Sequence, residues 1–161
     1  MELPPIPEEQ RDELLKLSNQ LCFPLYVCSK EVIKRYRPFL EPLGLTYTGY
    51  IAMMALWEED HINVKELGHR LFLDSGTLTP LMKKLEKLGY VTRTKDESDE
   101  RSILIDLTEK GRALKEQAFC VPLQLMATFP DGQEQIGNLK RDLDTLMLAL
   151  TQDRTGDAPS A

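Results

Sequence analysis

Residues 73–111, LDSGTLTPLMKKLEKLGYVTRTKDESDERSILIDLTEKG, hold the pattern that decides the fold. Their first part carries apolar residues at helical spacing, with Asp74 or Ser75 as N-cap and Gly89 as the stop. The period then changes, because VTRTK and SILIDL alternate or run β-branched on either side of the polar stretch DESDE. This stretch therefore predicts a helix followed by a two-stranded hairpin with a charged tip.

Helices are predicted on both sides of this stretch. One follows Thr46, a possible N-cap before an apolar face. A shorter helix starts at Asn63, which forms a capping-box-like pair with Glu66, and Thr108 is expected to cap the helix after the hairpin. Helix, turn, helix and hairpin is the order of a winged helix-turn-helix, here over about residues 46–110. VKELGHRLF would be its positioning helix and SGTLTPLMKKLEKLG its recognition helix.

The fold class is therefore mainly α with a small β-hairpin wing. Length and the absence of repeats indicate one domain over residues 1–161, with dimerisation helices at about 8–40 and 112–152 and a disordered tail at 153–161. A core helix within one subunit would explain the last apolar stripe, but the apolar N-terminal helix favours a shared dimer core. The stripe consists of Ile136, Leu139, Leu143, Leu146 and Leu150.

Composition sets the class of protein. The 161 residues are 42% apolar and 29% charged, which is typical of a globular chain. No apolar run reaches the roughly 18 residues of a membrane span, and the acidic, proline-rich start does not resemble a signal peptide. Three cysteines are too few for a disulfide scaffold, so a cytoplasmic location is expected. His61 and His69 lack a convergent ligand set, and neither a metal nor a cofactor is expected.

The net charge of −6 argues by itself against binding to nucleic acid. The charge is unevenly divided, however. Residues 61–115 hold 11 Lys or Arg and 9 Asp or Glu, a net of +2, whereas the remainder holds 9 and 17, a net of −8. The proposed DNA-facing lobe is therefore mildly basic, which predicts modest affinity with steep salt dependence.

Hydroxyls and cations gather on the predicted recognition helix. Short hydroxyl residues in its first turn suit phosphate and base-edge contacts, because the backbone N–H groups there lack partners. Lys83 and Lys87 share a face farther along, with Lys84 beside them. A solvated helix face is the plainer interpretation of the lysines. The candidate DNA contacts on this helix are Ser75, Thr77, Thr79, Lys83 and Lys84.

The predicted wing adds further cations. Arg93, Lys95 and Arg101 are assigned to the hairpin tip, where an arginine can enter a narrow minor groove. Asp99 lies two residues from Arg101 and can brace its side chain, although an ordinary surface ion pair is the alternative. Arg93, Arg101 and Asp99 complete the candidate DNA-binding set.

The stretch from 73 to 111 resembles the signature of the multiple-antibiotic-resistance-regulator (MarR) family. The run Asp99-Glu100-Arg101, followed by Leu107-Thr108 and Gly111, is similar to its wing motif, and the likeness covers about residues 18–150. The resemblance implies an obligate homodimer with interlocked terminal helices and two winged lobes on a palindromic DNA operator. It also implies DNA contacts from Ser75, Thr77, Thr79, Lys83 and Arg101, with Asp99 orienting the wing.

The segment NQLCFPLY, then Tyr36, then LTYTGY resembles the organic-hydroperoxide-resistance branch of that family. The resemblance implies that Cys22 senses organic hydroperoxide, with the hydroxyls of Tyr36 and Tyr47 as its hydrogen-bond partners. Peroxides react with thiolate, and a helix that begins at about residues 18–20 places Cys22 in its first turn, where the dipole favours an anion. A small buried hydrophobe is the alternative role for this cysteine.

The two other thiols bear on the fate of the oxidised sulfur. Cys28 lies about 9 Å along a continuous helix from Cys22, which excludes a disulfide between them within one subunit, so Cys28 is assigned a structural role. Some members of the branch resolve the sulfenic acid with a cysteine of the partner subunit. By that resemblance Cys120, placed in the helix after the wing, is a possible resolving cysteine or a core residue.

These observations predict a homodimeric, DNA-binding transcriptional repressor that releases a palindromic operator when organic hydroperoxide oxidises Cys22. The protein is not expected to be an enzyme or to contact a membrane. One rival is a family member that responds to a small aromatic ligand in the dimer pocket. Rivals of other classes are a thiol peroxidase and a helical dimerisation module, which leaves the wing arginines without a purpose.

Overall fold

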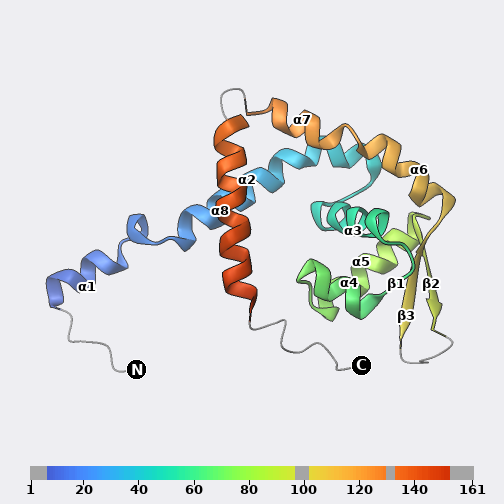
Figure 1. Ribbon diagram of the computed structural model, residues 1–161, viewed down its shortest axis with the longest axis horizontal. Helices are drawn as coiled ribbons and strands as arrows, with labels where there is room; N and C mark the ends of the chain where they lie inside the picture. The colour runs from blue at the N-terminus through green and yellow to red at the C-terminus, as the bar shows by residue number, and fades with distance from the viewer. Residues whose placement is uncertain (1–6, 97–101, 130–132, 153–161) are drawn as a thin grey trace. The chain divides into compact units, whose positions relative to one another are not determined.

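The computed structural model describes residues 7–96, 102–129 and 133–152. Two compact units are present, one up to Val121 and the other from Pro122 onwards. The helices and strands of the first unit, in chain order, are α1 (Glu8–Leu15), the 3-10 turn η1 (Leu17–Asn19), α2 (Cys22–Leu40), the 3-10 turn η2 (Glu41–Leu43), α3 (Tyr47–Glu58), β1 (Ile62–Asn63), α4 (Val64–Leu71), α5 (Ser75–Lys87), β2 (Val91–Lys95), β3 (Ile103–Leu107) and α6 (Glu109–Ala118) (Figure 1). Helix α7 (Val121–Ala127) starts at the boundary, and α8 (Gln133–Thr151) belongs to the second unit.

Side-chain caps fix the start of each helix in the winged lobe. An N-cap oxygen satisfies one of the backbone N–H groups that a first turn leaves unpaired, so these residues set where each helix begins. The four predicted caps are confirmed: Thr46 accepts from the Gly49 N–H at 3.2 Å, Asn63 from Glu66 at 2.8 Å, Asp74 from Thr77 at 2.9 Å and Thr108 from Gly111 at 2.9 Å.

The sheet has three strands where the sequence predicted a hairpin of two. Strand β1 pairs antiparallel with β3, and β3 pairs antiparallel with β2, which gives the order β1-β3-β2. Ile62 lies opposite Ile105 and is buried against the core. A strand of two residues is too short to show an alternating pattern, so the sequence carried no signal for it.

The core of the first unit lies between α3, α4, α5, α6 and the sheet. Its fully buried side chains include Met53, Leu56, Leu67, Met82 and Ile105. Trp57 packs against this core and donates from Nε1 to the Gly111 carbonyl at 2.9 Å. Apolar burial of this kind is the dominant stabilising contribution to such a lobe.

Helix α6 approaches the sheet most closely at Gly111. A Cβ atom at this position would lie 2.0 Å from the Tyr90 carbonyl oxygen, which is far inside any allowed contact. The Gly111 N–H also donates to the Thr108 hydroxyl, and the Thr108 N–H donates to the Tyr90 carbonyl at 3.0 Å. Glycine is therefore the residue that lets α6 dock onto the end of β2.

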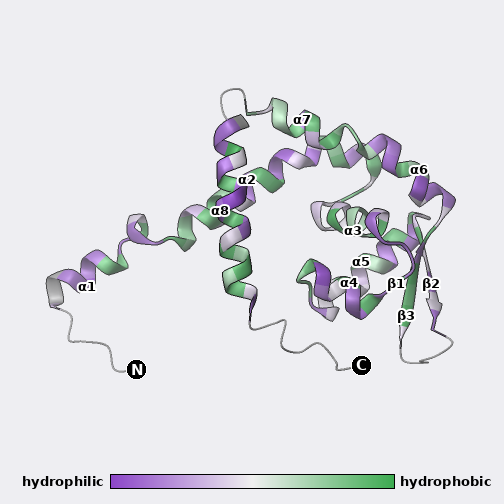
Figure 2. Cartoon of the chain, in the orientation of Figure 1, coloured by the Kyte–Doolittle hydropathy of each residue, from purple (hydrophilic) through white to green (hydrophobic). Residues whose placement is uncertain are grey.

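The helical region predicted over about residues 8–40 consists of two helices, and the one that carries Cys22 begins close to the predicted residues 18–20. Helix α1 ends at Leu15, a 3-10 turn follows, and α2 begins only at Cys22. Asn19 and Gln20 donate side-chain hydrogen bonds back to the carbonyls of Glu13 and Leu14, which offers the backbone an alternative to a continuous helix. Apolar residues recur along this segment in Figure 2, and many are exposed within the chain: Leu14, Leu15, Leu17, Leu21, Phe23, Tyr26, Val27 and Ile33.

The predicted C-terminal helix is confirmed as α8, and its apolar stripe is exposed at Leu139, Leu143 and Leu150. The helix predicted to run through Cys120 ends earlier, however. Helix α6 stops at Ala118, and Cys120 lies in the turn before α7. Within the described residues, every helix is too short or too polar to cross a membrane.

Candidate functional site

Helix α5 exposes one face that carries hydroxyls and lysines. Ser75, Thr79 and Lys83 follow each other at intervals of four residues, so they lie along one stripe, and all three are exposed. The opposite side of the helix is anchored in the core by Leu78, Leu81, Met82 and Leu85. Helix α5 is therefore held rigidly while its polar stripe faces outward.

Thr77 takes part in the cap at the start of this helix. Its N–H donates to Asp74 Oδ1, and its hydroxyl donates to Asp74 Oδ2 at 3.0 Å. The hydrogen bond from the Thr77 N–H, followed by that from its hydroxyl, lowers the pKa of Asp74. Because the hydroxyl proton is committed to the cap, the oxygen of Thr77 is oriented to accept a hydrogen bond from outside.

Two of the predicted wing residues, Arg93 and Lys95, lie on β2. Arg93 does not lie at the hairpin tip: it sits in the middle of β2 with 18% of its side chain exposed, and its Nη1 is 3.5 Å from Glu86 Oε2 on α5. Lys95 ends the strand and is exposed. Asp99 and Arg101 lie outside the described residues.

A pocket of about 430 Å³ opens between the end of α2, the start of α3 and α5. Lys84, predicted to contact DNA, forms part of its wall together with Tyr47. The lining combines three cations with one carboxylate and several apolar side chains: Ile33, Lys34, Arg37, Leu40, Glu41, Gly44, Leu45, Thr46, Tyr47 and Lys84. Such a lining suits a small anion that has an apolar body.

Tyr36 and Tyr47, predicted to act together, are brought together. Their ring centroids are 5.0 Å apart, and Tyr50 extends the cluster with its ring 6.0 Å from that of Tyr36. Burial raises the pKa of Tyr36, and the neighbouring phenols of Tyr47 and Tyr50 add to this effect. The Tyr36 hydroxyl therefore stays protonated and can donate a hydrogen bond at neutral pH.

Cys22 is the first residue of α2, which confirms the prediction that it occupies the first turn of a helix. Its side chain is exposed. Tyr36 lies fourteen residues farther along the same helix, a separation of about 21 Å at the helical rise. Cys22 and Tyr36 of one chain are therefore too far apart for contact, so within one chain the cysteine and the tyrosine cluster lie at separate places on α2.

The other thiols occupy distinct positions. Cys28 lies on the same uninterrupted helix as Cys22, so the exclusion of a disulfide between them within one chain stands. Cys120 is exposed, its Sγ lies 3.4 Å from the Gln117 carbonyl oxygen, and it is near enough to Tyr50 to affect that phenol. Burial raises the pKa of Tyr50 most, followed by Tyr47 and Cys120. Cys120 is therefore within range of an electrostatic interaction with Tyr50.

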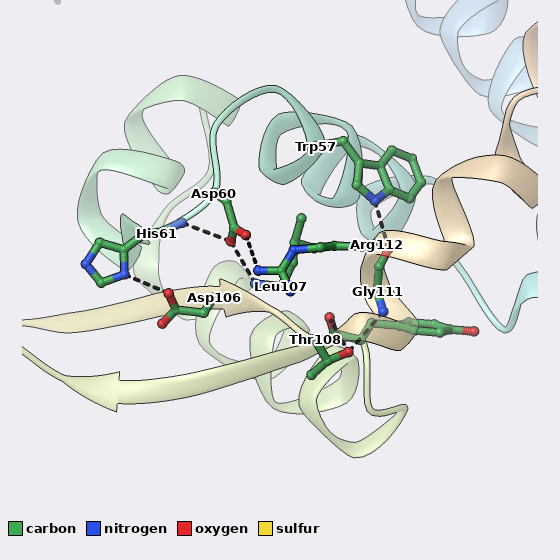
Figure 3. A network of polar contacts seen from close by, with 9 residues as sticks. Trp57, Asp60, His61, Asp106, Leu107, Thr108, Gly111 and Arg112 are labelled. Carbon is green, nitrogen blue, oxygen red and sulfur yellow. Dashed lines mark hydrogen bonds and ion pairs between the residues drawn. The ribbon is translucent and has the colours of Figure 1, made fainter.

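A polar network that the sequence did not reveal fixes the base of the wing (Figure 3). The Asp60 carboxylate accepts from the Leu107 N–H at 2.8 Å, from Arg112 at 2.7 Å and from the His61 N–H at 3.0 Å. His61 has a left-handed backbone, with φ of 61°, and its Nδ1 lies 2.6 Å from Asp106 Oδ1. These contacts tie the segment before β1 to β3 and α6.

Ionisation of both groups follows from the network. Burial disfavours the charged form of Asp60, but the hydrogen bonds from Leu107, Arg112 and His61 outweigh it and lower its pKa. The hydrogen bond to Asp106, followed by the charge of that carboxylate, raises the pKa of His61. Asp60 is therefore ionised at neutral pH and stabilises the fold in that form.

Replacing Asp60 with Ala is expected to destabilise the protein by about 2 kcal/mol, because the Leu107 N–H and Arg112 lose a charged acceptor. Since the folded-state pKa lies below the unfolded one, this stabilisation is present above the unfolded pKa and is lost as the pH falls through the folded pKa. Urea denaturation at neutral and acidic pH measures it. The exposed Glu116→Ala is the control, and equal stability of the two variants at neutral pH would contradict this role for Asp60.

Sequence reasoning missed three features of this surface. Tyr50 follows Tyr47 by three residues on a helix, a spacing that signals a shared face. Arg93 follows Val91 by two on a strand, which places both on the inner face. Asp60 had no such signal, because its partners are 47 and 52 residues away. Within the described ranges, His, Cys, Asp and Glu side chains do not group in a way that could hold a metal ion.

A helix that presents hydroxyls and lysines beside a β-wing is the arrangement with which winged-helix proteins bind duplex DNA. Fold and surface together define a DNA-binding transcriptional regulator. The chain belongs to the SarA/Rot family of transcriptional regulators, whose model matches residues 29–118. The MarR-like winged-helix fold predicted from residues 73–111 is thereby confirmed.

Several characterised relatives are similar over most of the chain. The organic hydroperoxide resistance transcriptional regulator of Bacillus subtilis (strain 168) is 45% identical and covers 89% of this chain and 98% of its own. The HTH-type transcriptional regulator SarZ of Staphylococcus epidermidis is 50% identical and covers 81% of this chain and 88% of its own. Reduced AbfR bound to DNA, a Staphylococcus epidermidis protein, superimposes with a TM-score of 0.75 at 32% identity and covers 90% and 96% of the two chains. AbfR has also been solved overoxidised on DNA and in a disulfide form.

Proposed function

We propose that this chain is a homodimeric repressor that binds a palindromic operator and releases it when an organic hydroperoxide oxidises Cys22. The observation that carries the proposal is the distance between Cys22 and the tyrosine cluster within one chain. An exposed cysteine begins α2, and a cluster of phenols lies about 21 Å farther along the same helix. We infer that Cys22 of one chain meets the tyrosine cluster of the other in the dimer.

The exposed apolar residues support a dimer. Large hydrophobic side chains are exposed within one chain on α1, η1 and α2, and separately on α8, and soluble monomers rarely leave large apolar patches uncovered. Self-association of two identical surfaces is the commonest way to bury them. Dimerisation would also place two recognition helices on one duplex, which is what a palindromic operator requires.

The reaction at Cys22 follows from thiol chemistry. The thiolate attacks the outer oxygen of the hydroperoxide, so an S–O bond forms while the O–O bond breaks. The alkoxide takes up a proton and leaves as an alcohol, and the sulfur becomes a sulfenic acid after losing two electrons. Two effects favour the anion: the N-terminal end of α2 and hydrogen bonds from the tyrosine hydroxyls.

Oxidation reaches the DNA-binding surface through packed helices. Tyr36 lies on α2 while Tyr47 and Tyr50 lie on α3, and α3 contacts both α4 and α5. A change at the tyrosine cluster therefore acts on α3, which packs against the recognition helix α5. Two lobes that read half-sites at a fixed spacing tolerate little displacement, so operator affinity falls.

Cys120 is the proposed resolving cysteine. It interacts electrostatically with Tyr50, and the Tyr50 ring is 6.0 Å from that of Tyr36. A Cys22 held against the same cluster by the partner subunit would find the Cys120 thiol nearby. Attack of that thiol on the sulfenic acid forms the disulfide and releases water.

Wild-type protein treated with cumene hydroperoxide is therefore expected to form a disulfide-linked dimer of about twice 18.4 kDa. Cys120→Ser should abolish the linked dimer and leave Cys22 as a sulfinic acid, or as a mixed disulfide where glutathione is added, because the sulfenic acid lacks its proposed resolving thiol. Non-reducing electrophoresis and intact-mass analysis distinguish the products. Cys28→Ser is the matched control and should still form the linked dimer; a linked dimer in Cys120→Ser would eliminate this role.

The pocket beside Tyr47 favours a second candidate function, the response to a small aromatic anion. Lys34, Arg37 and Lys84 surround about 430 Å³ next to an apolar wall. A ligand there would contact α2 and α5 together and would act on the recognition helix without any oxidation. Salicylate titrated against the protein–DNA complex under reducing conditions tests this response separately from the thiol.

The primary test is gel retardation of a duplex selected by the protein from a random-sequence library. Reduced protein should bind, and one equivalent of cumene hydroperoxide per chain should lower the affinity by at least about tenfold. A sensor should stop consuming peroxide after one turnover. A thiol peroxidase would instead continue to consume peroxide when a reductant is added. Retention of full affinity by fully oxidised protein would contradict the proposal.

A further inference from the structure

Arg93 is an unusual cation for a DNA-binding wing because it points inward. It follows Val91 by two residues on β2, and Val91 is buried, so the two side chains share the face that meets the core. Thr92 and Thr94, on the other face, are exposed. Only 18% of the Arg93 side chain remains accessible. Arg93 therefore lies between β2 and the neighbouring helix rather than on the outer surface.

The partner of Arg93 is on the recognition helix. Its Nη1 lies 3.5 Å from Oε2 of Glu86, which is in the last turns of α5. Its Nε is buried and has no hydrogen-bond partner within the described residues. Within the described residues Glu86 is the carboxylate that faces Arg93, and its own side chain is 44% exposed. Removing it would leave the arginine, which is only 18% exposed, without that compensating charge.

We propose that Arg93 is a positioning residue. Through Glu86 it fixes the orientation of the wing relative to the recognition helix, and it does not contact DNA itself. A winged helix engages DNA at two places, with its recognition helix in the major groove and its wing beside it. The Arg93–Glu86 pair joins these two elements across their shared inner surface. The inference rests on the proposed DNA binding and assigns a role within it.

This role predicts that Glu86→Gln weakens DNA binding, whereas simple electrostatics predicts that it strengthens DNA binding. Replacing Glu86 with Gln removes a negative charge from the DNA-binding lobe, and the field alone would then make binding tighter. If Glu86 holds Arg93 in place, the same change frees the arginine and lets the wing move. Affinity then falls although the lobe has become more positive.

The experiment measures affinity and its salt dependence on the duplex that wild-type protein selects from a random-sequence library. Glu86→Gln and Arg93→Gln should each weaken binding by about tenfold, and the double variant should be no weaker than either alone. The slope of log affinity against log salt should match wild type in all three. A lost phosphate contact would instead reduce that slope by about 0.9.

Footprinting supplies a readout that a general loss of stability would not move. Hydroxyl-radical protection of the flanks, where the wing lies, should be lost in Glu86→Gln, while protection by the recognition helix is retained. Arg93→Lys keeps a charge that can reach Glu86 and should recover binding to within about threefold of wild type. Glu116→Gln, an exposed carboxylate on α6, is the charge-matched control and should leave both affinity and footprint unchanged.

Each outcome decides the matter. Equal or tighter binding by Glu86→Gln overturns the proposal. A reduced salt slope in Arg93→Gln also overturns it and makes Arg93 a DNA contact. If either glutamine variant melts at a much lower temperature than wild type, Glu86→Asp and Arg93→Lys take their place, with the flanking footprint as the deciding readout. Failure of wild-type protein to select any duplex would instead count against the proposed function.

Discussion

Cys22→Ser protein is expected to bind its operator within about twofold of wild-type affinity and to remain bound in the presence of cumene hydroperoxide. Serine occupies almost the same volume at the start of α2, so the reduced state is preserved. A hydroxyl is not oxidised by peroxide, and the difference between oxidised and reduced affinity disappears. For wild type we expect that difference to be at least about tenfold, in the range common for allosteric coupling.

The measurement is a competition between wild type and variant on one labelled duplex, before and after oxidant. Cys28→Ser is the matched control, because its thiol is also exposed on the same helix but lies six residues farther along. It should respond to peroxide as wild type does. Release of Cys22→Ser by peroxide would rule out this cysteine as the sensor, whereas release by salicylate alone would point to the pocket beside Tyr47.

Gly111→Ala is expected to have the largest effect on stability. The added Cβ would lie 2.0 Å from the Tyr90 carbonyl oxygen and 3.2 Å from Leu107 Cδ2, so α6 has to move away from the sheet. That movement stretches the hydrogen bond from Trp57 to the Gly111 carbonyl and the cap from Thr108. We expect a loss of about 3 kcal/mol, the upper part of the range for overpacking, and a melting temperature lower by about 10 °C.

Gly137→Ala is the matched control for this variant. It introduces the same methyl group into helix α8, where a Cβ would have no atom within 4 Å. Alanine is the better helix former, so this variant should be as stable as wild type or more stable by up to about 1 kcal/mol. Thermal melts at one fixed protein concentration compare the two, since dimerisation would make the midpoint depend on concentration. Equal melting temperatures for the two variants would contradict the close approach at Gly111.

Local signals in the sequence predicted most of the winged lobe. Caps, a stop glycine and a change from helical to alternating period are properties of neighbouring residues, and Thr46, Asn63, Asp74 and Thr108 all act as predicted. Contacts between distant segments were not available in this way. The Asp60 network joins residues about fifty positions apart, and strand β1 exists only because β3 is there to pair with it.

The positions of two predicted site features compare differently with the sequence. Tyr36 and Tyr47 were expected to act together and their rings are in contact distance, whereas Arg93 was assigned outward and points inward. The alternation of β2 already contained that information, because a residue two positions after a buried valine shares its face. Counting cations near a predicted wing therefore overestimates the charge that faces DNA.

The length of α2 has a consequence for how the proposed repressor would respond to the amount of oxidant. Because one helix carries Cys22 at its first residue and Tyr36 about 21 Å away, each complete thiol site in the proposed dimer draws on both chains. Two such sites are related by symmetry in one assembly. If they oxidise independently, the share of dimers with both thiols intact falls as the square of the reduced fraction. Repression that needs both thiols intact would then be lifted well before half of the cysteines had reacted. The loss of repression would therefore exceed the fraction of oxidised cysteine at low levels of oxidant.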